Sequence, residues 1–163
     1  MIAIKMKNSV SPKLVQRLKV QGYCGISDNR ISELAFGNRF AYILCSGLIF
    51  IGVTMVSIPI LCIMMIIALY GVLLPYHPFD YIYNHLLGPF LGKPKLPPRS
   101  IQIKFACSIA TIWLALTTGL FFLDYVMTGY VFGGVLFLLT FTVSTTDICL
   151  PSLLYNYIFK VKI

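Results

Sequence analysis

Residues 40–79 read FAYILCSGLIFIGVTMVSIPILCIMMIIALYGVLLPYHPF, a run of forty residues without a charged side chain. A helix that crosses a bilayer needs about 20 apolar residues, so this run is too long for one span and suits two. Ser57-Ile58-Pro59 supplies the break, because proline lacks the N–H that a helix interior needs and fits the first turn of a new helix. We predict a first span over residues 39–57 and a second over residues 59–75.

Two more charge-free runs follow, at residues 105–123 and 125–146, with Asp124 between them. Asp124 and the nearby Thr128-Gly129 supply the turn signal. We predict a third span over residues 105–123 and a fourth over residues 126–146. The expected fold is therefore an all-α membrane protein with four transmembrane helices, in a transmembrane domain over residues 39–148.

The composition agrees with this class. Of the 163 residues, 58% are hydrophobic and 11% are charged, whereas a soluble domain carries about 25% charged residues. The net charge of +8 comes from cations that flank the apolar runs and are not interleaved with aromatic residues on a soluble fold. We therefore expect anionic lipid headgroups, and not nucleic acid, as the partner of these cations.

The cations also predict the orientation. Seven precede the first span, four lie between the second and third spans, two follow the fourth, and the turns after spans one and three have none. With four spans, every cation lies on one side, and the positive-inside rule makes that side cytoplasmic. We expect cytoplasmic segments at residues 1–38, 76–104 and 149–163. The cations are Lys5, Lys7, Lys13, Arg17, Lys19, Arg30, Arg39, Lys93, Lys95, Arg99, Lys104, Lys160 and Lys162.

Short helices are predicted outside the spans. Apolar residues recur at helical spacing from Pro78 to Leu91, which predicts an amphipathic helix in the membrane interface between spans two and three. A basic, proline-rich connector follows, and we expect its neighbouring cations to contact lipid headgroups. Ser11-Pro12 can begin a short basic turn, and Asp28 can cap a helix that leads into the first span. The four headgroup contacts are Lys93, Lys95, Arg99 and Lys104.

His77, Asp80 and His85 form a candidate polar site at the interface. The two histidines are eight residues apart, which places them about 12 Å apart on one straight helix, so one metal ion cannot bind both. We expect no metal and no cofactor here. We expect the histidines to flank an aromatic anchor, with a proton-linked or quinone-headgroup role as the alternative.

Five cysteines are present, and no two of them form a Cys-x-x-Cys pair. We expect Cys45, Cys62 and Cys107 to be small apolar packing residues. Cys24 and Cys149 are candidate redox thiols on the cytoplasmic side, because Cys149-Leu150-Pro151-Ser152 is a Cys-x-x-Cys pattern with serine in the second position. A lone thiolate there can form a mixed disulfide but cannot resolve it without a partner, for which Cys24 is the candidate.

Several segments together resemble a family of small bacterial membrane proteins catalogued as a domain of unknown function. They are Gly22 to Cys24, Pro75 to Asp80, Lys93 to Arg99 with Lys104 to Cys107, and Cys149 to Tyr155. The resemblance implies four spans and a bacterial inner membrane. The family's C-terminal motif is Cys-x-x-Cys followed by tyrosine, and Ser152 departs from it, so only Cys24 and Cys149 can carry a thiol role here.

No ionisable residue lies deep inside a predicted span, and neither a ligand set nor a nucleophile with its base is present. We predict a non-catalytic membrane protein that serves as accessory subunit or assembly partner of a larger inner-membrane complex, with other membrane-protein subunits as partners. Two alternatives stay open. One is thiol–disulfide exchange through Cys24 and Cys149, and the other is lipid or quinone binding, which predicts an apolar groove beside His77 and His85.

Overall fold

The computed structural model describes residues 11–161, and every regular element within them is helical. Lys5, Lys7 and Lys162 of the predicted basic pattern lie outside the described residues. The all-α class is confirmed for the described part. Its helices are α1 (Pro12–Val20), α2 (Asp28–Thr54), α3 (Ile58–Leu73), α4 (Pro78–Ile82), α5 (Gly88–Phe90), α6 (Ile101–Phe122), α7 (Val126–Thr146) and α8 (Leu150–Ile158), and a π-helical turn, Tyr83–Leu87, joins α4 to α5.

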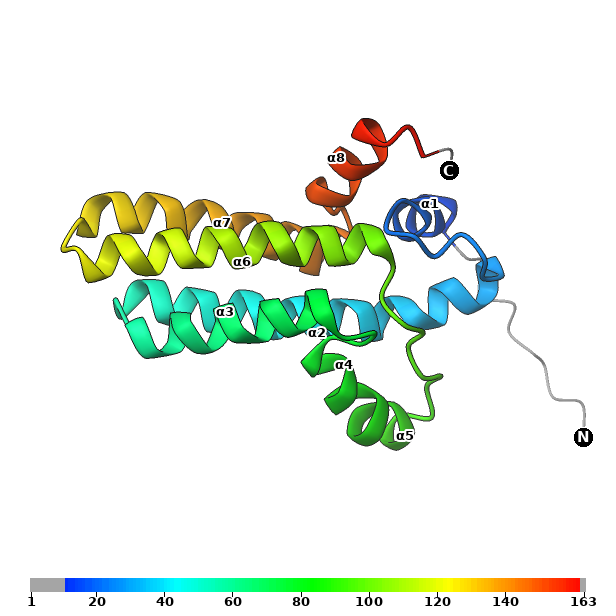
Figure 1. Cartoon of the computed structure of the whole chain (residues 1–163). Coiled ribbons are helices and arrows are strands. Elements are labelled where there is room, and N and C mark those ends of the chain that lie inside the picture. The colour runs from blue at the N-terminus through cyan, green and yellow to red at the C-terminus, as the bar shows by residue number, and fades with distance from the viewer. Residues whose placement is uncertain (1–10, 162–163) are drawn as a thin grey trace, which may run out of the picture.

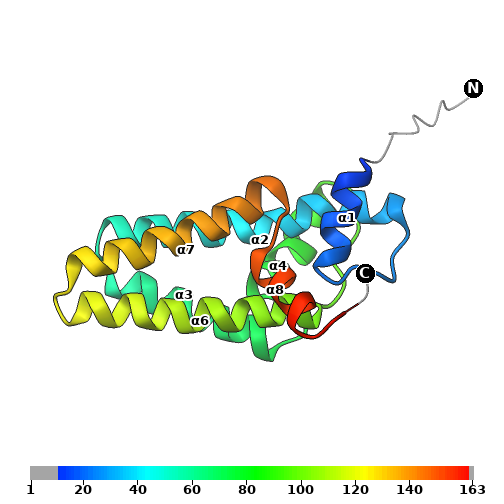
Figure 2. The same cartoon turned by 90° about the horizontal axis from the view of Figure 1, so that it is seen from above.

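Four helices, α2, α3, α6 and α7, pack side by side as a bundle (Figure 1). Short turns join α2 to α3 and α6 to α7 at one end of this bundle. The remaining short helices gather at the opposite end, where α1 and α8 contact each other (Figure 2). The basic, proline-rich connector at residues 91–100 lies at the same end as α1 and α8.

Three of the helices, α2, α6 and α7, are long and apolar enough to cross a membrane. Helix α3 has 16 residues, about 24 Å at 1.5 Å per residue, which is shorter than a hydrocarbon core of about 30 Å. It counts as a fourth span only together with the segment Pro78–Phe90, from which it is bent by 80°. Length and composition thus support the predicted membrane class with three spans, or up to four.

The predicted break in the first apolar run is confirmed. Helix α2 ends at Thr54 and α3 begins at Ile58 with Pro59 in its first turn. Helix α7 has the bounds predicted for the fourth span, and α6 begins four residues before the predicted third span because the Ser100 side chain accepts the N–H of Ile103 as its N-cap. The N-cap of α2 is Ser27, one residue before the predicted Asp28.

The short helices differ more from the sequence expectation. Residues 78–90 are helical as predicted, but with a π-helical turn in the middle. The short basic turn expected after Ser11-Pro12 is the helix α1, which buries Val15 and Leu18. Helix α8 was not predicted. Pro151 lies in its first turn, a position where proline is common.

The apolar core has two parts. One lies at the end that carries the short helices and includes Leu18, Ile31 and Tyr83. The other lies within the bundle and includes Leu61 and Leu114. Between these two clusters lie the polar residues and the cavity described next.

Candidate functional site

A buried ion pair, Asp80–Arg99, joins the start of α4 to the connector before α6. Asp80 is 0% exposed and Arg99 is 7% exposed. The Nε and Nη2 groups of Arg99 donate to the two carboxylate oxygens of Asp80, and Nη1 donates to Oδ1 of Asn38 at 2.8 Å. Burial lowers the pKa of Arg99, but Asp80, together with the nearby Tyr23 and Tyr42, outweighs this effect, and the pKa is raised well above its usual value. A forked, fully buried pair of this kind fixes both segments against α2.

Arg99 therefore does not lie where the sequence placed it. It was expected at the lipid headgroups, and the structure buries it beside Asp80, whose carboxylate supplies a closer and less hydrated partner. Lys93 and Lys95 are exposed, and the Nζ of Lys93 lies 5.1 Å from the ring centroid of Phe36. Lys104 is partly buried. Headgroup contacts by these three lysines stay a prediction.

A second ion pair joins Arg39 of α2 to Asp147, which follows α7 and is 1% exposed. Gln21 links the two ion pairs: its Nε2 donates to the carbonyl of Asp147 at 2.8 Å, and its Oε1 accepts from Nδ2 of Asn38 at 3.1 Å. The hydroxyl of Tyr23 also donates to Oδ1 of Asn38, at 3.2 Å. These contacts form one polar network across the end of the bundle.

His77 and Asp80 lie together, as predicted, while His85 lies apart from them. His77 is the N-cap of α4: its Nδ1 accepts the N–H of Phe79 at 3.3 Å, and Oδ2 of Asp80 accepts the N–H of His77 at 3.0 Å. His85 is exposed and stacks on the ring of Tyr81. The structure therefore brings two of the three predicted polar residues into one site.

The imidazole of His77 is a neutral hydrogen-bond donor at pH 7. His77 is 6% exposed, and this burial, together with the charge of Arg99, lowers its pKa to about 4. Because Nδ1 accepts a backbone N–H, the neutral ring carries its proton on Nε2. Nε2 has no hydrogen-bond partner among the described residues, and the ring lines a cavity.

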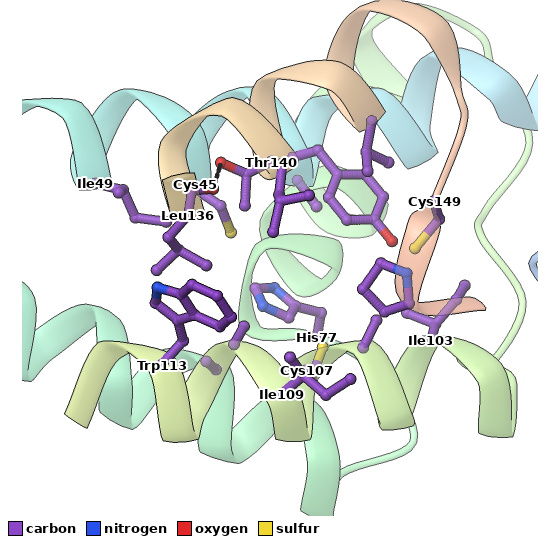
Figure 3. A pocket seen from close by; sticks show the side chains of 18 of the residues that line it. Cys45, Ile49, His77, Ile103, Cys107, Ile109, Trp113, Leu136, Thr140 and Cys149 are labelled. Atoms are coloured by element: carbon purple, nitrogen blue, oxygen red, sulfur yellow. Dashed lines mark hydrogen bonds between the residues drawn. The ribbon is translucent and has the colours of Figure 1, made fainter. Parts of the chain in front are cut away.

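This cavity lies between α2, α3, α6 and α7 and has a volume of about 90 Å³ (Figure 3). Its walls are mostly apolar, and Trp113, the one tryptophan of the chain, is among them. Polar groups come from His77, Arg99 and Tyr42, and thiols come from three cysteines. The lining includes Tyr42, Cys45, Ile49, Met64, Ala68, His77, Arg99, Cys107, Ala110, Trp113, Leu114, Leu136, Thr140 and Cys149.

Tyr42 and Cys107 complete the polar end of the cavity. The hydroxyl of Tyr42 is buried without a hydrogen-bond partner among the described residues, and the Tyr42 ring lies 5.8 Å from the guanidinium carbon of Arg99. A Cβ atom on Gly71 would lie 2.7 Å from Cδ2 of His77 and 3.1 Å from Sγ of Cys107, so the imidazole and this thiol meet at the same point of α3.

The two predicted redox thiols lie in different surroundings. Cys24 is exposed and donates to the carbonyl of Lys19 at 3.3 Å, whereas Cys149 is buried on the cavity wall. Both are free thiols, and exchange between them stays a prediction. Cys45 and Cys107, expected to be packing residues, line the cavity as well. Within residues 11–161, no three His, Cys, Asp or Glu side chains converge on a point that can hold a metal ion.

A family model described as "Domain of unknown function (DUF4395)" matches residues 36–160. This match covers most of the chain, so the chain belongs to that family. It includes the bundle helices, both aspartates of the buried ion pairs and the whole cavity lining. No curated protein matches the chain, and no solved structure matches it.

Proposed function

We propose that this member of the DUF4395 family is a four-span membrane protein that binds a quinone-type molecule inside its helix bundle. The observation that carries the proposal is the apolar cavity with His77 at its polar end. A mostly apolar pocket with a few converging polar groups is the usual form of a small-molecule site. Quinone binding was one of the alternatives from the sequence, and it predicted an apolar groove beside His77 and His85. The cavity lies beside His77 and is not lined by His85.

The polar groups fit a carbonyl oxygen. His77 offers a neutral N–H, and Tyr42 offers a hydroxyl without a protein partner. Both groups can donate a hydrogen bond to a carbonyl oxygen, and a ligand that accepts from the buried hydroxyl of Tyr42 removes the cost of leaving that hydroxyl unpaired. The charge of Arg99 is already balanced by Asp80. The site therefore offers no net charge to stabilise a charged ligand, and it favours a neutral one.

The cavity volume limits how much of a quinone ring can enter without a change in the protein. A dry cavity of about 150 Å³ accepts benzene, and the cavity here is smaller, at about 90 Å³. The carbonyl-bearing edge of a ring fits directly, and the rest of the ring needs a side chain to move. Met64 on the cavity wall is suited to this, because methionine is unbranched and adapts its shape at low cost.

The topology is part of the proposal. Helix α3 packs with the other bundle helices, which supports counting it as a fourth span. The described cations belong to segments at the end of the bundle that carries α1, α8 and the connector, which supports a cytoplasmic assignment for that end in a bacterial inner membrane. Lys93 and Lys95 are the exposed cations of the connector that we assign to anionic headgroups.

The accessory-subunit function predicted from the sequence is compatible with a bound quinone but has no specific contact surface to support it. Exposed apolar side chains occur over the whole bundle, where lipid would cover them. We therefore keep ligand binding as the proposed function and membrane subunits as possible further partners.

Trp113 allows a direct test. With the protein in lipid nanodiscs, we expect decylubiquinone to quench its fluorescence to saturation, because Trp113 lies on the cavity wall. Replacing Tyr42 with Phe removes one donor and should weaken binding roughly threefold to tenfold, the usual effect of one neutral hydrogen bond. The matched control is Tyr81→Phe, at an exposed tyrosine outside the cavity. Quenching that rises linearly with the decylubiquinone concentration, and is the same in the Tyr42→Phe variant, would overturn the proposal.

A further inference from the structure

One of the cavity thiols has surroundings unlike those of the others. Cys149 is the N-cap of α8, a helix of nine residues. Ser152, three residues later, is 0% exposed, and its hydroxyl has no hydrogen-bond partner among the described residues. Ser152 and Tyr42 lie near the sulfur without forming a hydrogen bond of standard geometry, and both oppose the rise that burial causes in the pKa of Cys149.

Burial raises the pKa of the Cys149 thiol, and these surroundings limit that rise, so they favour the thiolate, the form that attacks. The first turn of a helix presents unpaired N–H groups, which stabilise a thiolate placed at that end. The hydroxyl of Ser152 can turn toward the thiolate, since it has no other hydrogen-bond partner in the described chain.

The other thiols lack this combination. Cys45 and Cys107 line the same cavity, but each lies inside its own helix, α2 or α6, and not at the N-terminus of that helix. Cys62 lies in α3 and does not line the cavity, and Cys24 is exposed outside the bundle. Cys149 alone has a cavity position, a helix N-terminus and free hydroxyl donors together.

We propose that Cys149 is the covalent attachment site for a quinone with an unsubstituted ring carbon that has entered the cavity. This inference rests on the proposed quinone binding and adds a reaction to it. The sulfur of Cys149 attacks the open ring carbon, a C–S bond forms, and the π electrons move to the carbonyl oxygen. The thiol proton and the proton displaced from the ring carbon both end on the two quinone oxygens, so the product is a hydroquinone thioether.

This step needs no further oxidant or reductant. The quinone is reduced to the hydroquinone level by the electron pair of the sulfur, which becomes a thioether. The oxygen that gains charge would face the donors of the cavity, the N–H of His77 and the hydroxyl of Tyr42. Donors aimed at developing charge in a dry site are the arrangement that most lowers such a barrier.

The experiment uses the full chain with Cys24→Ser in lipid nanodiscs, so that the exposed thiol does not compete. Menadione, which has one open ring carbon, is added, and peptide mass spectrometry locates the adduct. We expect the adduct on Cys149 and much less on Cys62. An excess of decylubiquinone, which has no open ring carbon, should protect Cys149. Ser152→Ala should slow the reaction about tenfold, and Ser152→Thr should restore it, because a hydrogen bond to the Cys149 thiolate increases the fraction of this reactive form by about that much.

The two proposals fail in different ways. Saturable quenching of Trp113 by decylubiquinone without a menadione adduct on Cys149 would overturn the covalent inference and leave the binding proposal standing. An adduct that forms equally on Cys62, or that decylubiquinone does not prevent, would also overturn it. Absence of saturable quenching would contradict the binding proposal first, and the attachment site with it.

Discussion

At the scale of single residues, the pair Asp80–Arg99 matters most, because its members are nearly fully buried and also position His77. Replacing Arg99 with Met leaves the carboxylate of Asp80 buried without its partner. We expect this variant to lose about 3–5 kcal/mol of stability, the usual cost of breaking a buried pair. Thermal unfolding in detergent measures the loss. Arg99→Met combined with Asp80→Leu should recover part of it, and Lys95→Met, at an exposed site, should lose little.

The buried His77 should make the stability of the folded protein depend on pH. Its pKa is lowered to about 4 in the folded protein, against about 6.5 when unfolded. Below pH 6.5 the unfolded chain binds a proton that the folded site resists, so stability falls as the pH falls toward 4 and then levels off. We expect a loss of roughly 2 kcal/mol between pH 7 and pH 5 from this group. The variant His77→Asn keeps a capping side chain and should remove that part of the slope; an unchanged slope would contradict the assignment.

At the scale of helices, the sequence predicted the helix ends and turns that depend on neighbouring residues. Proline at position 59 placed the turn after α2, and charge-free runs placed α6 and α7. Helix α8 was missed because Pro151 has two meanings, a helix end or a first turn, and only the packing of α8 on α6 decides between them. The partners of Arg99 and Arg39 lie 19 and 108 residues away in the chain, a separation that no local pattern encodes.

The cavity could be predicted only in part for the same reason. His77 and Cys149 were candidate residues in the sequence, because a histidine beside an aspartate and a cysteine at a span end are visible patterns. Tyr42 and Cys107 lie in apolar spans and gave no signal of their own. Their place on the cavity wall depends on how four helices pack, as Figure 3 shows for Cys107.

Packing of the bundle helices can be tested at Gly133 of α7. A Cβ atom there would lie 2.5 Å from Cγ2 of Val53 in α2, whereas a Cβ on the next residue, Gly134, would meet nothing within 4 Å. Gly133→Ala should therefore destabilise the bundle by about 1–3 kcal/mol through overpacking. Gly134→Ala should be neutral or slightly stabilising, since alanine favours helix more than glycine. Equal thermal stability of the two variants would show that α2 and α7 do not approach in this way.

At the scale of the whole molecule, the number of spans decides which side each segment faces. With four spans, the residues before α2 and the connector share one side, and with the three spans α2, α6 and α7 they face opposite sides. We expect single cysteines at the exposed Lys13 and Lys95, introduced into a chain without other cysteines, to react with a membrane-impermeant reagent only after the cytoplasmic side is opened. A cysteine at Asp124 should react from the other side. Labelling of Lys13→Cys and Lys95→Cys from opposite sides would contradict the four-span topology.

The central claim is that a quinone-type ligand occupies the cavity between the four helices, and two positions of α6 test it most directly. Ala110 lines the cavity, and Ile112 is 64% exposed on the outer face of the same helix. Decylubiquinone binding to each Phe variant is measured by quenching of Trp113. We predict that Ala110→Phe abolishes saturable quenching and that Ile112→Phe leaves it unchanged. Saturable quenching of equal affinity in both variants would contradict binding inside the cavity.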